Sequence, residues 1–435
     1  MADIVTSRVF VDGEKGITAA KLNDITASSV IQPAFYTSKP TAGTADPTDI
    51  ALILKSGAYA QVPVSTLGGS ATQAQIWSTR LRSYNAIGNP NFGVIQRNFA
   101  GLLTNPVSGT FIEDRWQRNG AGTYTFTAQF LGATTPDVAV PGTSFRITNR
   151  FLRTTLTAVQ ASLGVSDHLT YYQSVEGPNL IELQTDVHSV SLLVRSSVAN
   201  LNFGLSLRDP PTSTRSLTKL CTIPTANVWS LIQLPNLPVW PSGNFTTGPG
   251  GLGYVLGICL AAGTSLTSPA NDTWQNGSFL GAIGQSNFAA SPLNSTFDIA
   301  FVQHEPGAIC TTLMDKPFLQ NLDECLRYYQ KSYQYGNAAG SATFFGGCCG
   351  QVATNNLTLI TPGASFKKIM AKAPTGTVYS ESGAVNNVRN ATSAVDAAVA
   401  GTQYFYDSGI MQVALSASGV AGNVYRYQYI ADTGW

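Results

Sequence analysis

The chain has 435 residues, which is enough for about two to four domains with buried cores. Only 11% of the residues are charged and the net charge is +1 without any cluster of Lys and Arg, so we expect no nucleic-acid partner. The longest nearly apolar run, 251–263, is too short and too rich in Gly to cross a bilayer, so we expect no membrane insertion.

The first 69 residues have the pattern of a small separate unit. Thr18 can cap a short helix at 19–30, and an apolar strand follows at 50–57. This unit is too small and too rich in loops to bury much core alone, so we expect it to pack on another protein chain. Residues 70–87 then carry a helical stripe, which fits either a very short coiled coil or a plain connecting helix or loop. The stripe consists of Ala74, Trp77, Leu81 and Tyr84.

The pattern changes to short strands over 88–316. In 123–130 the residues Tyr124, Phe126, Ala128 and Phe130 alternate with polar ones, as expected of a strand with one buried face. Further strands are expected at 188–197, 201–209, 253–263 and 295–303. No helix of normal length fits between them, so the sequence predicts a mainly β domain, an antiparallel β-sandwich or jelly roll.

The clearest helix in the sequence is predicted at 317–336. Pro317 suits its first turn, Asp323 and Arg327 are spaced as an ion pair, and Gly336 can end it. Its apolar stripe consists of Leu319, Leu322, Leu326, Tyr329 and Tyr333. We expect this helix to connect the jelly roll to a smaller β domain at 337–435, with strands within 366–380, 402–417 and 423–433.

Catalytic and metal-binding patterns are missing from the sequence. It has no serine-hydrolase elbow and no Walker A loop, and its six Cys and three His form no closely spaced ligand set. Glu113 and Asp114 are adjacent, so on a strand they would point to opposite faces rather than converge as a catalytic pair. We therefore expect no enzyme activity, no metal and no cofactor. The neighbouring Cys348 and Cys349 fit a pair of free thiols or a vicinal disulfide.

An ordered series of motifs over about 89–435 resembles bacteriophage virion fibre proteins with a carbohydrate-binding-module-like jelly roll. The series comprises NPNFGVIQRN (89–98), FIEDRWQR (111–118), VWSLIQLPNLP (228–238), GICLAAGTSLTSPANDTWQNGSF (257–279), TFDIAFVQHEPGA, DECLRYYQKSY and the Tyr-rich last strand. His304 departs from the pattern, because the class usually has an apolar residue there. This departure suggests a partly exposed strand end.

The resemblance implies a structural fibre located in the virion and made in the host cytoplasm. It implies a homotrimer that is attached through 1–69 to another virion protein and that presents its β domains to a host surface polysaccharide or lipopolysaccharide. A tail fibre is the first interpretation, and a capsid-attached head fibre or decoration protein is the alternative. A polysaccharide-degrading spike enzyme is the alternative from another class.

Two sets of site residues follow from this resemblance. The jelly-roll framework set consists of Gln96, Arg97, Asp114, Arg115 and Trp116, where Asp114 and Arg115 could pair with each other or with backbone groups and Arg97 could bind Gln96 or a turn carbonyl. The receptor-binding set consists of Tyr404, Tyr406, Tyr425, Tyr427, Tyr429 and Trp435. Because Tyr425, Tyr427 and Tyr429 share one face of a strand, they fit packing in the core or between subunits, and we expect an intersubunit seam rather than an open glycan-binding surface.

Overall fold

The chain divides into two compact units, residues 1–74 and 75–435. The computed structural model describes residues 50–55, 58–63, 84–97, 101–132, 138–139, 146–147, 150–184, 187–209, 215–241, 246–354, 359–401 and 403–435. In the first unit, β1 (Ile50–Lys55) pairs with β2 (Ala58–Pro63) as an antiparallel hairpin, which confirms the strand predicted at 50–57. The helix predicted at 19–30 and most of the helical stripe at 74–84 lie outside the described residues.

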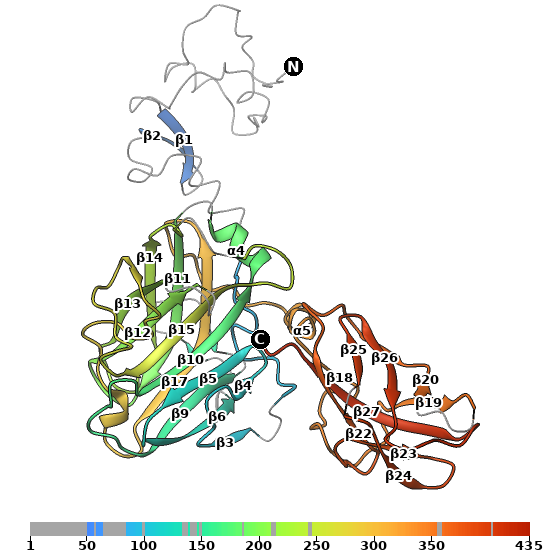
Figure 1. The fold of residues 1–435 in the computed structure, drawn as a ribbon. Helices are drawn as coiled ribbons and strands as arrows, with labels where there is room; N and C mark the ends of the chain where they lie inside the picture. The colour runs from blue at the N-terminus through green and yellow to red at the C-terminus, as the bar shows by residue number, and fades with distance from the viewer. Residues whose placement is uncertain are drawn as a thin grey trace, which may run out of the picture. The chain divides into compact units, whose positions relative to one another are not determined.

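Two antiparallel sheets form a β-sandwich in the second unit (Figure 1). The first sheet consists of β4 (Phe111–Glu113), β5 (Trp116–Ala121), β10 (His168–Glu176), β12 (Leu201–Arg208), β13 (Arg215–Ile223), β15 (Leu252–Ala262) and β16 (Trp274–Asn276). The second consists of β3 (Leu102–Thr104), β6 (Thr125–Gly132), β9 (Arg150–Ala158), β11 (His188–Ser196), β14 (Ser230–Leu237) and β17 (Thr296–Pro306). A separate two-stranded pair is formed by β7 (Val138–Ala139) and β8 (Arg146–Ile147).

The strand order shows that neighbours in the sandwich are mostly distant in sequence. The first sheet runs β16-β13-β12-β15-β10-β5-β4, and the second runs β14-β11-β17-β9-β6-β3. The mainly β, antiparallel prediction is therefore confirmed, and the five predicted strands correspond to β6, β11, β12, β15 and β17. The longest connections pair residues more than a hundred positions apart, as in β11 with β17 and β9 with β17.

The sandwich core lies between the two sheets and follows from the alternation in the sequence. The predicted inward residues Phe126, Ala128 and Phe130 of β6 are all buried, and so is Tyr124 just before the strand. They belong to one large apolar cluster that also contains Trp116, the largest fully buried side chain among the described residues. A short 3-10 turn, η2 (Phe288–Ala290), adds its buried Phe288 to the same cluster.

A helix inside the strand-rich region escaped the prediction. α4 (Gly177–Gln184) directly follows β10, and its Leu180 and Leu183 are buried in the sandwich core. The spacing of these two leucines and Pro178 near the helix start are the signals that could have revealed it. Because α4 has only eight residues, the sequence is too short there to show a clear helical repeat of apolar residues.

The connecting helix is much shorter than predicted. α5 (Phe318–Leu326) has nine residues, and the chain then forms β18 (Tyr329–Lys331) instead of continuing to 336. The backbone of β18 pairs with Ile430–Asp432 of the last strand, which supplies the hydrogen bonds that further helical turns would have made. The predicted ion pair between Asp323 and Arg327 is wrong, because Asp323 binds Lys368 and Arg327 binds Glu176.

The C-terminal residues form a second, smaller β domain with its own apolar core. Besides β18, its strands are β19 (Cys348–Val352), β20 (Leu359–Thr361), β21 (Ala364–Ser365), β22 (Thr375–Tyr379), β23 (Asn387–Asn390), β24 (Val395–Ala398), β25 (Tyr404–Tyr406), β26 (Gly409–Ala414) and β27 (Val424–Asp432). The long strand β27 is central, because it pairs with β18, β19, β22 and β23.

The predicted C-terminal strands are present with different extents. The strand expected within 366–380 occupies only β22, and the one within 402–417 is a hairpin of β25 and β26. Within the described part of the chain, no helix is both long and apolar enough to span a membrane.

Candidate functional site

The predicted framework residues gather around the turn between β4 and β5. Asp114 and Arg115 form this turn, and Arg115 has a backbone φ of +74°, in the left-handed region that long side chains rarely adopt. Trp116 follows on β5 with its ring in the core, and its Nε1 donates to the carbonyl oxygen of Asn89 at 3.1 Å. The structure therefore brings the framework set together, and all of its side chains are buried.

The two adjacent carboxylates of this turn lie together, which corrects the expectation that they point to opposite faces. Asp114 accepts from the backbone N–H of Gln96 at 2.6 Å, and Glu113 accepts from those of Arg97 and Asp114 at 3.3 and 3.0 Å. The turn bends the backbone after Glu113, so the strand alternation does not apply. Burial raises the pKa of both carboxyls, and the Asp114 charge raises that of Glu113 further.

Arg97 reaches the C-terminal domain rather than Gln96 or a turn carbonyl as predicted. Its guanidinium donates to both carboxylate oxygens of Asp432 at the end of β27, with an Nη2–Oδ1 distance of 2.9 Å. The guanidinium carbon also lies 3.5 Å from the ring centre of Phe111 and 4.3 Å from that of Tyr329. Arg97 therefore has a structural role, because it joins the jelly roll to the last strand.

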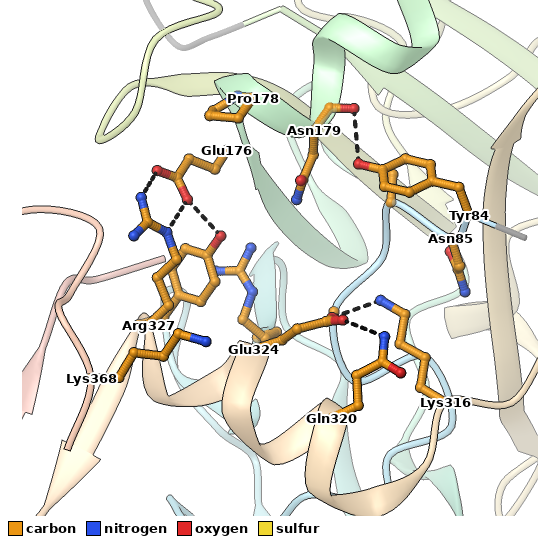
Figure 2. Close-up of a pocket in the computed structure, with 14 residues that line it drawn as sticks. Tyr84, Asn85, Glu176, Pro178, Asn179, Lys316, Gln320, Glu324, Arg327 and Lys368 are labelled. Carbon is orange, nitrogen blue, oxygen red and sulfur yellow. Dashed lines mark hydrogen bonds and ion pairs between the residues drawn. The ribbon is translucent and has the colours of Figure 1, made fainter. Parts of the chain in front are cut away.

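Arg115 of the framework set borders a cleft of about 400 Å³ (Figure 2). The cleft lies among the segment before β3, the β4–β5 turn, the start of α4, helix α5 and a loop of the C-terminal domain. Charged side chains make up much of its wall, namely Arg115, Glu176, Lys316, Glu324, Arg327 and Lys368. Nothing local in the sequence singles out Glu176, because its partner Arg327 lies about 150 positions away.

Glu176 is the most fully bonded group of the cleft. Arg327 donates to its two oxygens at 2.7 and 2.5 Å, the Tyr328 hydroxyl donates at 2.9 Å, and the backbone N–H of Gly250 donates at 2.8 Å. Burial alone would raise the pKa of Glu176, but these hydrogen bonds lower it below its usual value. The carboxylate is therefore ionised at neutral pH and already has its full set of donors.

The receptor-binding set does not form a single surface. Tyr425, Tyr427 and Tyr429 of β27 are buried in the core of the C-terminal domain, so they are neither an open glycan surface nor a seam between subunits. Trp435 does not belong to that core, and Lys372 Nζ lies 4.4 Å from its ring centre. The three tyrosines do share one face of β27, as the alternation predicted, but this face packs inside the chain.

Tyr404 and Tyr406 are the exposed members of the set. They lie two residues apart on β25 with 42% and 48% of their surfaces exposed, while the intervening Phe405 packs on the domain core. The β25–β26 pairing is irregular between Tyr404 and Phe405, and the exposed Met411 of β26 has no paired residue there. Tyr406 and Met411 also line a hollow of about 430 Å³. We call Tyr404, Tyr406 and Met411 the tyrosine patch.

His304 lies in the sandwich core, which corrects the expectation of a partly exposed strand end. Its Nε2 lies 3.0 Å from Nδ1 of His188, and its Nδ1 lies 2.7 Å from the Tyr254 hydroxyl. His188 Nε2 in turn lies 3.1 Å from the carbonyl oxygen of Pro238. These polar partners satisfy both rings, so the structure accommodates a histidine where the class has an apolar residue.

Comparisons with known proteins assign no family to the chain. No protein-family model matches the chain, and no curated protein matches it. Among solved structures, TmCBM61 in complex with beta-1,4-galactotriose is 11% identical, with a TM-score of 0.26, and the match covers 52% of this chain and 99% of that one. The enzymatically active domain of bacteriophage CBA120 tailspike protein 4 is 10% identical, with a TM-score of 0.24. This match covers 51% of this chain and 21% of the tailspike chain.

A family 11 carbohydrate-binding module from Clostridium thermocellum gives a similar result. It is 10% identical with a TM-score of 0.24, and the match covers 48% of this chain and 98% of the module. Similarities this weak assign neither a family nor a ligand. The mainly β, antiparallel architecture therefore rests on the chain's own sheets and registers.

Proposed function

We propose that this protein is a structural fibre of a bacteriophage virion that attaches to a polysaccharide of the host surface. The ordered motifs over 89–435 support the fibre class, and the sandwich with a separate C-terminal β domain agrees with it. In this proposal the chain is a homotrimer, and residues 1–69 bind another protein of the tail, or of the capsid if it is a head fibre.

The tyrosine patch is the observation that carries the attachment role. Two exposed tyrosines on one face of β25 offer flat apolar rings to sugar C–H groups, and their hydroxyls remain available to sugar hydroxyls. The adjoining hollow of about 430 Å³ falls in the range of roughly 300–1,000 Å³ that is usual for small ligands. The patch therefore has the shape and chemistry to hold a sugar unit.

The proposal includes no catalytic step. Glu113 and Asp114 are buried in the β4–β5 turn, and Glu176 is held by Arg327 and Tyr328. A glycosidase needs two carboxyl groups that face a bound sugar across a cleft, one of them free to give a proton. These three carboxyls instead hold the framework and the cleft wall in place.

A polysaccharide titration with patch variants tests the attachment role. We expect the double variant Tyr404→Ala/Tyr406→Ala to bind purified host surface polysaccharide about ten- to a hundredfold more weakly than wild type, as for loss of two aromatic contacts. Phe344→Ala/Phe345→Ala is the matched control, because it removes another exposed aromatic pair from the same domain. An equal loss of affinity in both variants, or no loss in the first, would contradict the patch assignment.

Light scattering on the same samples measures the mass of the assembly and tests the proposed homotrimer.

A further inference from the structure

The charges around the cleft of Figure 2 are paired except at one position. Figure 2 shows Glu324 bound to Lys316 and Gln320, and Glu176 bound to Arg327. Lys368 pairs with Asp323 at the rim. Arg115 is the exception, since no carboxylate lies within ion-pair distance of its guanidinium in the described part of the chain.

The Arg115 side chain is only 3% exposed and lacks partners for most of its donors. Its Nη2 donates to the carbonyl oxygen of Ser174, whereas Nε and Nη1 make no hydrogen bond to any described residue. Burial lowers the pKa of the guanidinium, but arginine remains a cation at physiological pH. A buried cation with unused donors is costly unless an acceptor reaches it.

Neighbouring residues fix the orientation of this guanidinium. Its carbon lies 3.5 Å from the ring centre of Tyr328, whose hydroxyl is itself bonded to Glu176. A Cβ added at Gly88 would meet Arg115 Nε at 3.2 Å, which shows how closely the Gly88 backbone packs against this side chain. The donors are therefore held in place before any ligand arrives, which limits the entropy lost on binding.

We propose that this cleft is a second binding site, independent of the tyrosine patch, and that it takes an acidic saccharide whose carboxylate binds Arg115. A carboxylate in the cleft supplies the opposite charge that no described carboxylate gives to this guanidinium at ion-pair distance. The volume of about 400 Å³ exceeds the need of a small inorganic anion and suits a sugar unit. Asn179 and Gln320 on the wall can serve its hydroxyl groups.

Calorimetric titration of the full chain with three defined probes tests this proposal. We expect trigalacturonate to bind at least about tenfold more tightly than neutral galactotriose, and the difference to shrink at about 0.5 M salt. Arg115→Gln should weaken trigalacturonate binding about ten- to a hundredfold, as for loss of a hydrogen bond to a charged group. Arg118→Gln, which removes another buried guanidinium outside the cleft, should leave it unchanged.

A second variant covers the case in which Arg115→Gln fails to fold. Gln320 is exposed on α5 at the cleft wall, so Gln320→Trp should block the cleft without disturbing the core. Equal affinity for the acidic and neutral trisaccharides, full trigalacturonate binding by both variants, or tighter binding of galactose 6-phosphate would each overturn the proposal. Tyr404→Ala/Tyr406→Ala should leave this titration unchanged, so failure here is distinct from failure of the tyrosine patch.

Discussion

Arg97 of the jelly roll and Asp432 of the last strand form an ion pair across 335 residues of sequence, with the guanidinium held between the rings of Phe111 and Tyr329. Arg97 also lies 3.8 Å from Asp114, so one cation serves carboxylates from both domains. Because the Arg97 side chain is only 7% exposed, solvent screens this pair weakly. The pair therefore couples the stability of the C-terminal domain to the β4–β5 turn.

Replacing Arg97 by Met should destabilise the C-terminal domain by about 2–4 kcal/mol, because it leaves Asp432 and the buried Asp114 without their cation. Urea unfolding followed by limited proteolysis at the domain junction measures this. The control is Lys219→Met, which breaks the pair with the mostly exposed Asp272 and should cost less than about 1 kcal/mol. If both variants lost the same unfolding free energy, the Arg97 pair would stabilise the protein no more than an exposed ion pair does.

Acid should destabilise the sandwich through its buried histidine pair. Burial lowers the pKa of His188 to about 4 and that of His304 well below its usual value. Below about pH 6.5 these histidines therefore bind protons in the unfolded chain but not in the folded one. Their contribution to the unfolding free energy is fully present above about pH 6.5 and is lost as the pH falls toward 4. The loss from His188 should reach on the order of 3 kcal/mol.

Unfolding free energies measured from pH 7.5 to 4 check this, with His188→Gln/His304→Gln as the comparison. The buried carboxyls Glu113 and Asp114 act in the opposite direction, because their raised pKa favours the folded state in acid. They are present in both proteins, so the difference between wild type and variant isolates the histidines. An equally steep acid loss in the variant would refute the histidine account.

The core position of the β27 tyrosines predicts opposite results for two substitutions at one site. The Tyr427 hydroxyl is buried without a hydrogen bond in the described residues, so Tyr427→Phe should leave stability unchanged or raise it by up to about 1 kcal/mol. Tyr427→Ala should cost about 3–5 kcal/mol because it opens a cavity. Chemical denaturation measures both, and dissociation of subunits without loss of domain stability would instead favour an intersubunit seam.

The neighbouring Cys348 and Cys349 are both free thiols in the structure and do not form the vicinal disulfide. Cys349 is exposed, whereas partial burial raises the pKa of Cys348 to about 11. A maleimide reagent at neutral pH should therefore label Cys349 first in the native protein. Mass spectrometry after proteolysis identifies the labelled thiol, and Cys349→Ser should abolish the fast phase.

Local pattern predicted most of the architecture, and long-range contacts account for most of what it missed. The alternation of Tyr124 to Phe130 identified a strand and its buried face, because burial in a sandwich repeats every second residue. The helix beginning at 317 was predicted too long, because the pairing of Tyr329 with Asp432 that ends it depends on a strand a hundred residues later. Local periodicity carries no information about that partner.

The same distinction holds for the candidate sites. The alternation in β27 and β25 looked alike in sequence, yet Tyr427 is buried and Tyr404 is exposed. Which tyrosines face outward depends on the strands that cover them, and those come from elsewhere in the chain. The cleft joins Arg115, Glu176 and Arg327 from three distant segments, so no single motif could have revealed it.

Immunogold electron microscopy of virions, with an antibody raised against residues 337–435, tests the central claim most directly. The fibre account predicts gold at the ends of thin projections, with label on the tail for a tail fibre or on the capsid for a head fibre. Virions that contain no labelled projections, while the antibody recognises the purified protein, would contradict it.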